Sequence, residues 1–163
     1  MRRSLFQKSC GIIPAYADAE GELRFLLLNS GLVKNPRATW EFPKGSMEAG
    51  ENELQTARRE CFEETGLDEV RLVPGYRAID TYSFHREGRR IRKRVVYFVA
   101  LVSDPEAMKT EPDGREHVYD SEGRWAQWLT YEECRSTLFH HGQRRILATA
   151  RAHVLGLGLA DTR

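Results

Sequence analysis

One stretch of this 163-residue chain, residues 45–67, constrains the fold more than any other. It reads GSMEAGENELQTARRECFEETGL and contains six acidic residues. Asn52 is a favourable N-cap with Gln55 three residues later, and Gly66 is placed to end a helix. The stretch therefore predicts a helix over residues 52–65 whose surface concentrates negative charge.

The acidic residues of this predicted helix do not point away from the protein. With 100° between successive residues, four glutamates fall within an arc of roughly 100°: Glu53, Glu60, Glu63 and Glu64. The apolar stripe that would dock the helix borders this arc and consists of Leu54, Ala57 and Cys61. Like charges one helical turn apart repel each other, and burial makes the charged form costlier. The acids therefore need positive partners or a bound cation.

Two interpretations of the acidic face are open at this point. A solvated amphipathic helix would pair some of its glutamates with Arg58 or Arg59, which is a common arrangement. Alternatively, the carboxylates converge on a hard cation such as Mg²⁺ or Mn²⁺, which prefers oxygen ligands. Magnesium usually completes its coordination with water and substrate phosphates, so the second interpretation points to phosphate chemistry.

The spacing of the stretch favours the cation site. It fits the pattern G-x5-E-x7-R-E-U-x-E-E-x-G-U, where U is apolar, with Gly45, Glu51, Arg59, Glu60, Cys61, Glu63, Glu64, Gly66 and Leu67. This pattern resembles the defining box of the Nudix hydrolase family. Cys61 is a mild departure, because a larger aliphatic residue is usual there, and it affects packing rather than ligation. The resemblance implies metal-dependent hydrolysis of a nucleoside diphosphate linked to another group.

The resemblance also implies a fold and a set of roles. Nudix domains are α/β (α+β) proteins, built as an α/β/α sandwich with a mixed central sheet that carries the loop–helix–loop box. Two or more Mg²⁺ or Mn²⁺ ions are expected, held by the backbone carbonyl of Gly45 and the carboxylates of Glu60, Glu63 and Glu64. Glu51 and Arg59 would support them, Arg59 through an ion pair that orients a ligand. Glu53 lies outside the motif and is interpreted as a surface acid or an outer-sphere acid of the metal site.

Sequences outside the box narrow the resemblance. They are SCGII, FLLL, WEFPKG, YxF…KxVVYFVA and, late in the chain, E-x5-WL. Together they resemble the asymmetric diadenosine tetraphosphate hydrolases over most of residues 9–150. RNA 5′-pyrophosphohydrolases and diphosphoinositol polyphosphate hydrolases share several of these features. In such relatives a glutamate six residues before the strand tryptophan reaches the metal cluster, which implies Glu122 as a ligand or catalytic base, with Glu116 as its rival.

Four side chains are candidates for binding the substrate. Lys44 enters the box, and its compact charge suits a phosphate oxygen, although loop lysines are often merely solvated. Tyr82 and Phe84 share one face of a predicted strand and would stack on a nucleobase, if they do not belong to the core of the sheet. The basic run of residues 85–94 is typical of a solvated hairpin tip, but within it the resemblance implies Lys93 as the best candidate for a phosphate contact, because the similar enzymes carry a lysine near this point of the strand.

The pattern along the chain predicts one layered domain over residues 1–163, with a core from about residue 8 to residue 155. Strands are expected at residues 9–17 and 23–29, a long hairpin from 70–84 and 91–102, and a further strand at 124–130. Residues 103–121 form a polar loop. Helices are expected at residues 131–139 and 143–157, the second as a closing helix.

The bulk properties exclude several classes of protein. A formal net charge of +1 gives no global field for a nucleic-acid or membrane partner. Three cysteines without a CxxC pair argue against a disulfide framework and fit a reducing compartment. Gln7 and Lys8 interrupt the apolar run that a secretory signal needs, and no run reaches the roughly 20 apolar residues of a membrane span. We therefore expect a cytoplasmic enzyme or binding domain.

These observations lead to one functional prediction and three alternatives. The predicted reaction is hydrolysis of diadenosine tetraphosphate (Ap4A) to ATP and AMP by water, with Glu60, Glu63 or Glu122 as the base and Arg59 supporting catalysis. The same box would also serve a 5′-triphosphorylated RNA end or a diphosphoinositol polyphosphate. A non-catalytic nucleotide-binding module is less consistent with the sequence, because such modules usually lose box glutamates and this box is intact. The oligomeric state is not predicted.

Overall fold

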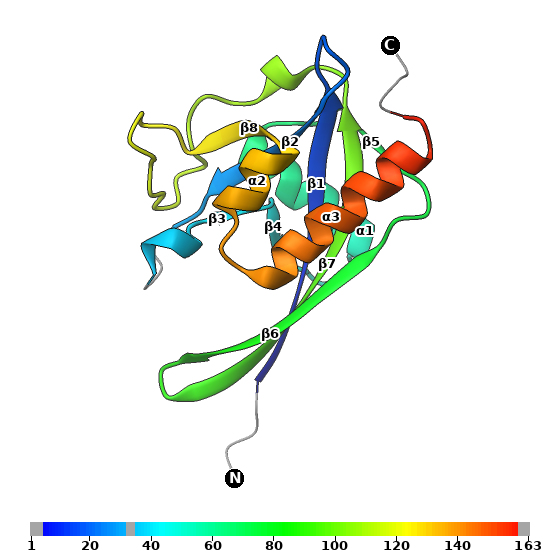
Figure 1. Cartoon of the computed structure of the whole chain (residues 1–163). Helices are drawn as coiled ribbons and strands as arrows, with labels where there is room; N and C mark the ends of the chain where they lie inside the picture. The colour runs from blue at the N-terminus through cyan, green and yellow to red at the C-terminus, as the bar shows by residue number, and fades with distance from the viewer. Residues whose placement is uncertain (1–4, 32–34, 160–163) are drawn as a thin grey trace.

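A computed structural model describes residues 5–31 and 35–159 of the protein. It contains one mixed sheet and three α-helices (Figure 1). The strands are β1 (Leu5–Ala17), β2 (Leu23–Asn29), β3 (Trp40–Glu41), β4 (Lys44–Ser46), β5 (Val70–Leu72), β6 (Ala78–Arg86), β7 (Arg89–Val102) and β8 (Ala126–Thr130). The helices are α1 (Glu53–Thr65), α2 (Tyr131–Thr137) and α3 (His141–Gly156), with short 3-10 turns at Pro36–Ala38 and Pro105–Ala107.

The centre of the sheet is the parallel pair of β1 and β7. These strands are paired from Leu5 with Ile91 to Ala15 with Leu101. All other strand pairs are antiparallel: β2 and β4 pair with β1, β3 and β8 pair with β2, and β5 and β6 pair with β7. The long central strands are rich in Ile and Val, which suit a sheet buried on both faces. The predicted mixed central sheet is therefore confirmed.

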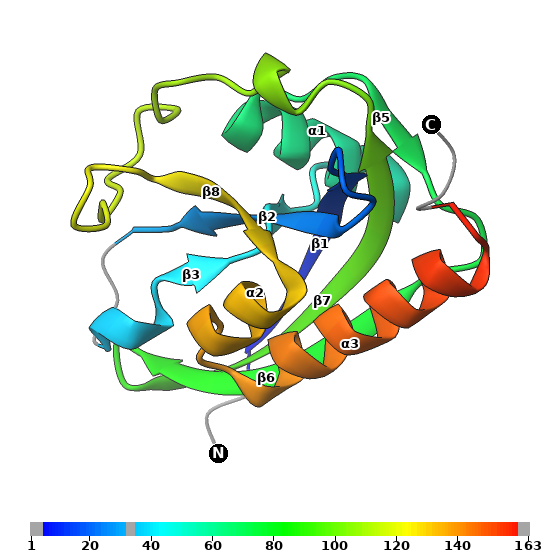
Figure 2. The same ribbon diagram turned by 45° about the horizontal axis from the view of Figure 1, so that its top comes forward.

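Helices cover both faces of this sheet, as Figures 1 and 2 show. Helix α1 packs on one face over an apolar cluster that includes Cys10, Ala57 and Cys61. Helices α2 and α3 pack on the other face over a larger cluster that includes Phe25 and Leu147. The result is the layered α+β sandwich that the sequence predicted. Within the described ranges, no helix is both long and apolar enough to cross a membrane.

Helix α1 begins and ends where its local sequence predicts. The Asn52 side chain accepts a hydrogen bond from the Gln55 backbone, and the Gln55 side chain accepts one from the Asn52 backbone, which is a capping box. Gly66 ends the helix with a φ of 78°, a left-handed conformation that glycine adopts without strain. Glu60 and Glu64 are buried with the apolar stripe, so the acidic face does border the packed seam.

The long hairpin differs in part from the prediction. Pro74 and Gly75 form a turn that divides residues 70–84 into two strands, and the first of them, β5, pairs with the far end of β7. Strand β6 pairs with β7 along Ala78–Arg86 and continues past the body of the domain (Figure 1). Strand β1 also begins earlier than expected, at Leu5, because its first residues pair with β7.

The projecting segment is called the arm below. It consists of residues 5–8 of β1, 81–86 of β6 and 89–94 of β7. Cys10, Cys61 and Cys134 are buried free thiols.

Candidate active site

Gly45 and Glu60 are in direct contact at the centre of the candidate site. Gly45 lies in β4, opposite Cys10 of β1, and this pairing holds its backbone beneath helix α1. A Cβ atom built on Gly45 would lie 1.9 Å from the carboxyl carbon of Glu60. Any side chain at position 45 would therefore displace the carboxylate. Glycine is needed here for the close approach of a backbone to a charged group.

Arg59 organises the acids around this contact. Its guanidinium donates hydrogen bonds to Glu51 (2.5 Å), Glu60 (2.9 Å) and Glu63 (3.1 Å), and to the backbone carbonyl of Ser46 (2.9 Å). The hydrogen bond from Arg59 is the main reason that the pKa of Glu51 falls to about 2. The arginine thus favours the charged form of Glu51, gathers three carboxylates around one guanidinium and ties helix α1 to the end of β4.

Glu64 is buried more deeply than the other glutamates of the box. Its residue is 3 % exposed, and burial raises the pKa of the carboxyl to about 7 although Arg115 opposes this shift. The Arg115 Nη2 atom lies 2.9 Å from Oε1 of Glu64, but the approach lacks the geometry of a hydrogen bond, so this oxygen has no hydrogen-bond partner. Asp113 holds the same guanidinium at 2.7 Å. This buried carboxylate oxygen thus has an ion pair but no hydrogen bond.

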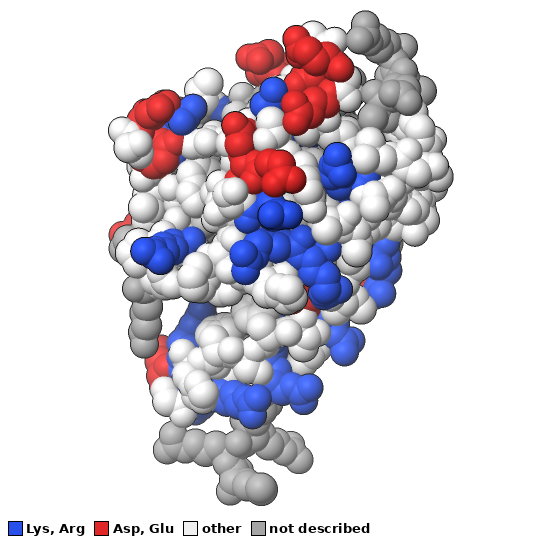
Figure 3. Space-filling model, in the orientation of Figure 1, with Lys and Arg blue, Asp and Glu red and all other residues white. Residues whose placement is uncertain are grey.

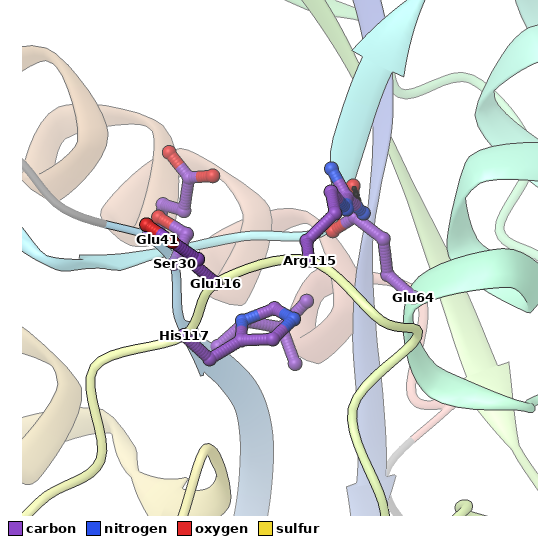
Figure 4. Close-up of a pocket in the computed structure, with 8 residues that line it drawn as sticks. Ser30, Glu41, Glu64, Arg115, Glu116 and His117 are labelled. Carbon is purple, nitrogen blue, oxygen red and sulfur yellow. Dashed lines mark ion pairs between the residues drawn. The ribbon is translucent and has the colours of Figure 1, made fainter.

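A cavity of about 270 Å³ opens beside Glu64. Figure 4 shows Glu64 and Arg115 at one end, with Ser30, Glu41 and Glu116 at the other. His117 fixes the loop that forms one wall, because its Nδ1 atom lies 3.0 Å from the Asn29 carbonyl oxygen. The cavity therefore joins helix α1, the end of β2 and the loop between β7 and β8.

Lys44 is buried against Glu41, and the two side chains form an ion pair of 2.9 Å. Burial disfavours the charged lysine, but the attraction of Glu41 outweighs it and raises the pKa of Lys44. Lys93, on β7, is half-buried nearby. Burial, together with the charge of Lys44, lowers the pKa of Lys93 to about 8. Two lysines thus lie close together beside the cavity, which favours an anionic ligand there.

The aromatic candidates lie on the same side of the sheet as Lys93. Tyr82 pairs directly with Lys93 across β6 and β7, and its side chain is 40 % exposed. Phe84 follows on the same face, with its ring centroid 6.2 Å from that of Tyr82. Neither residue belongs to the two buried core clusters. An aromatic pair beside a lysine, with Tyr82 exposed and Phe84 half-buried, is an arrangement that suits a nucleobase.

The structure separates the two glutamates proposed from the loop before β8. Glu116 lines the cavity beside Glu64. Glu122 lies in a turn, is largely exposed and forms an ion pair of 2.8 Å with Arg124. In this arrangement Glu116 is the better placed of the two, and the role of Glu122 stays a prediction.

Sequence reasoning missed Glu41 and Arg115. Glu41 could have been noticed, because it precedes Lys44 by three residues within the WEFPKG segment. Arg115 had no comparable signal, since it lies in an irregular polar loop and reaches Glu64 only through the fold.

The residues around Gly45 fit a small, oxygen-preferring cation. Within residues 5–31 and 35–159, no three acidic, histidine or cysteine side chains are gathered closely enough to hold a metal ion as they stand. Their present partners explain this, because Arg59 engages Glu60 and Glu63 while Arg115 approaches Glu64. The donor set is nevertheless all oxygen, and a buried Glu64 oxygen lacks a hydrogen bond.

Comparisons with known proteins agree with this geometry. A family model described as NUDIX domain matches residues 6–150. A protein of Caulobacter vibrioides named RNA pyrophosphohydrolase is 32% identical over 101 residues, covering 56% of this chain and 58% of the relative. A mouse protein named asymmetrical bis(5′-nucleosyl)-tetraphosphatase is 39% identical over 67 residues, covering 40% of this chain and 43% of the relative. The chain thus spans about half the length of these relatives.

Solved structures share the fold. The binary complex of the C. elegans Ap4A hydrolase has a TM-score of 0.70 and 22% identity, covering 92% of this chain and 98% of that one. The M. smegmatis Nudix hydrolase RenU has a TM-score of 0.63 and 13% identity, covering 93% and 88%. Since the intact box lies on this fold and the family model matches residues 6–150, the chain belongs to the NUDIX domain family.

Proposed function

We propose that this protein is a divalent-cation-dependent pyrophosphohydrolase that cleaves diadenosine tetraphosphate to ATP and AMP. The observation that carries the proposal is the contact of Gly45 with the Glu60 carboxylate, beside a buried Glu64 oxygen and a cavity of about 270 Å³. Such a concentration of carboxylates is stable only with positive partners, and a cation with its phosphate ligand supplies them. Two relatives named for polyphosphate hydrolysis support the same chemistry.

The box residues would hold the cation. The carboxylates of Glu60, Glu63 and Glu64 and the backbone carbonyl of Gly45 are the proposed ligands for two or more Mg²⁺ or Mn²⁺ ions. When bound, the ions supply positive charge that stabilises the negative charge developing on the phosphate under attack. Arg59 acts as a positioning residue, because it already fixes the orientation of Glu60 and Glu63.

The proton of the attacking water must move to a base. The proposed bases are Glu60, Glu63 and Glu122, and the position of Glu116 beside Glu64 adds it to this group. A carboxylate with an unoccupied oxygen can accept a proton without first losing a hydrogen bond. The base therefore has to be a glutamate that is not fully engaged by Arg59.

The lysines and aromatic residues would hold the parts of the substrate that do not react. Lys44 and Lys93 offer charge to the phosphates that are not attacked, and their closeness suits a chain of several phosphates. The exposed ring of Tyr82, with the half-buried ring of Phe84 beside it, offers a stacking surface for adenine. Together these groups favour a substrate that combines a nucleobase with a polyphosphate.

A second candidate substrate is the 5′-triphosphate end of an RNA. The basic arm favours it, because an RNA places many phosphates beyond the cleaved bond whereas a dinucleotide does not. A diphosphoinositol polyphosphate has no nucleobase and would leave the pair of Tyr82 and Phe84 without a role.

A cytoplasmic location of the protein is part of the proposed function.

The test is a product analysis. The protein is incubated with diadenosine tetraphosphate and Mg²⁺, with an EDTA control, and the nucleotides are resolved by chromatography. ATP and AMP in equal amounts, abolished by EDTA, are expected.

Two molecules of ADP would contradict the asymmetric cleavage. No cleavage would remove this substrate, and triphosphorylated RNA and diphosphoinositol substrates would be tested next. Tight nucleotide binding without turnover on any of them would indicate a non-catalytic module.

A further inference from the structure

Three arginines form a row along one face of the arm. Arg90, Arg92 and Arg94 alternate along β7, so their side chains share one face of the strand. All three are exposed. This is the face opposite to Tyr82 and Lys93, because the residues of β6 that pair with the row are Thr81, Ser83 and His85. The row is therefore separate from the side chains assigned above to the substrate.

Strand β1 extends this basic face. Phe6 pairs with Arg92 and Lys8 pairs with Arg94 in the parallel register, so both side chains lie on the same face as the row. The guanidinium of Arg94 lies 5.6 Å from the centroid of the Phe6 ring, and Phe6 is 57 % exposed. The face thus combines a line of cations with an exposed aromatic ring.

The arm carries an excess of positive charge. Its three strand segments contain seven Lys and Arg residues and no Asp or Glu, and the turn between β6 and β7 contributes one acid, Glu87. In the part of the chain that the structure describes, Arg92 and Arg94 form no ion pair, while Lys8 is paired with Glu53 of helix α1 at 2.8 Å. Figure 3, which views the molecule from the side of α2 and α3, shows Lys and Arg side chains on the lower, projecting part, with an acidic side chain at its edge. An excess of exposed positive charge attracts a polyanion from solution.

The spacing of the row suits an extended polyanion. Residues two apart on a strand are separated by roughly 6.6 Å. This is comparable with the distance between successive phosphates of an extended single nucleic-acid strand, so each arginine can meet one phosphate. An exposed Phe6 ring offers a stacking surface to a base, which a line of cations alone does not.

The row also leads toward the candidate active site. Cys10 follows Lys8 on the same face of β1 and pairs with Gly45 of β4. At this point helix α1 covers the sheet, and its first residue, Glu53, contacts Lys8. A strand that lies along the row therefore reaches the edge of the helix that carries the acidic box.

We propose that this face of the arm, formed by Arg90, Arg92, Arg94 and Phe6, binds the phosphate backbone of single-stranded RNA. The inference deepens the proposed pyrophosphohydrolase function, on which it rests for the chemistry at the 5′ end, and gives RNA a second contact away from the cleaved bond. A second copy of the arm is a poorer occupant, because seven like charges on each copy repel. An anionic lipid surface is the remaining rival.

The test uses the full chain and a fluorescent single-stranded RNA of about 12 nucleotides with a 5′-hydroxyl end. Such a probe carries no pyrophosphate, so binding and hydrolysis are measured independently. The arm variant replaces Arg90, Arg92 and Arg94 by Gln. The control variant replaces the exposed Arg37, Arg71 and Arg135 by Gln, which removes the same charge elsewhere. Thermal unfolding of both variants establishes that they are folded.

The wild type should bind the RNA with a steep dependence on salt. The arm variant should bind about tenfold more weakly or worse at 0.1 M salt, and its salt slope should fall by about 2, since each neutralised phosphate of a single strand contributes roughly 0.7. The control variant should bind within about twofold of the wild type.

Equal losses in both variants, or no RNA binding by the wild type, would overturn the proposal. Binding to phosphatidylserine vesicles but not to RNA, lost only in the arm variant, would overturn it in favour of a lipid surface.

An independent change tests the aromatic contact. Phe6→Ala should weaken RNA binding about fivefold while leaving the salt slope unchanged, because stacking carries no net charge. A change in slope without a loss at fixed salt would contradict the stacking role. Hydrolysis of diadenosine tetraphosphate, measured in parallel, separates failure of this proposal from failure of the proposed function.

Discussion

Helix α1 and the arm each gather charges of one sign, but they hold them differently. Glu60 and Glu64 are buried, and an arginine lies within 3 Å of each of them. Arg92 and Arg94 are exposed on a projecting ribbon and form no ion pair within the described residues. The glutamates have a fixed geometry on the packed face of helix α1. The arginines are spread along a strand in water.

The difference teaches how burial selects a ligand. Burying several carboxylates together costs free energy unless a compact positive charge lies among them, so their geometry suits a small cation. Exposed cations at regular spacing cost little, because water and salt screen them, and they suit a long polyanion. The following predictions test this contrast, beginning with the largest effect.

Removing one buried charge should abolish turnover without unfolding the protein. Glu60→Gln and Glu64→Gln should each lower kcat by about a hundredfold or more, because each removes a proposed cation ligand, while the thermal midpoint is not lowered. The matched control is Glu132→Gln on the exposed surface of α2. Normal turnover in either box variant would end the assignment of these glutamates to the cation.

Filling the space at Gly45 should have a similar effect through geometry alone. In Gly45→Ala the new Cβ would overlap the Glu60 carboxylate, so activity should fall by at least about tenfold and stability by about 1–3 kcal/mol. Gly156→Ala is the control, because it lies in α3 with open space around it. It should leave turnover unchanged. Chemical unfolding and kcat are measured for both, and equal behaviour would contradict the role of the contact.

The pH dependence of substrate binding should report Lys93. Its pKa is lowered to about 8 by burial and by Lys44, so it is charged below that pH and loses its charge as the pH rises through it. If Lys93 contacts a phosphate, KM should rise severalfold between about pH 7 and pH 9. Lys93→Gln should have a high KM throughout. A wild-type rise that persists in this variant would assign the titration to another group.

The smallest effect is expected where helix α1 meets the arm. Hydrogen bonds from Arg77 and then Lys8 lower the pKa of Glu53 to about 2, below its ordinary value of 4.5. A depressed carboxyl pKa stabilises the fold above about pH 4.5, and this contribution is lost as the pH falls toward 2. We expect about 1 kcal/mol, since the pair is partly solvated.

This stabilisation can be isolated by comparing two proteins at two pH values. The difference in unfolding free energy between the wild type and Arg77→Gln should be larger at pH 6 than at pH 3, measured by urea titration. Glu51 and other acids titrate in both proteins and largely cancel in this difference. An identical difference at both pH values would show that the contact of Arg77 with Glu53 does not contribute through charge.

Helix α1 and its box could be predicted because their signals are local. Asn52, Gln55 and Gly66 determine where the helix begins and ends through hydrogen bonds within a few residues. The helical period then determines which glutamates border the apolar stripe, so the acidic face beside the core followed from spacing alone. Strands β2 and β8 and helix α3 were predicted for similar reasons, since periodicity and turns are also local.

Other features depended on contacts between distant parts of the chain. Arg115 reaches Glu64 from 51 residues away in the sequence. His117 fixes the loop that carries Arg115 to the end of β2. The choice between Glu116 and Glu122 depends on that loop, whose register has no periodic signal. The parallel pairing of β1 with β7 likewise creates the basic face of the arm. The sequence by itself determined which charges this protein carries and on which helix, whereas only the tertiary structure decided which charges meet, because burial and long-range pairing are properties of the packed chain.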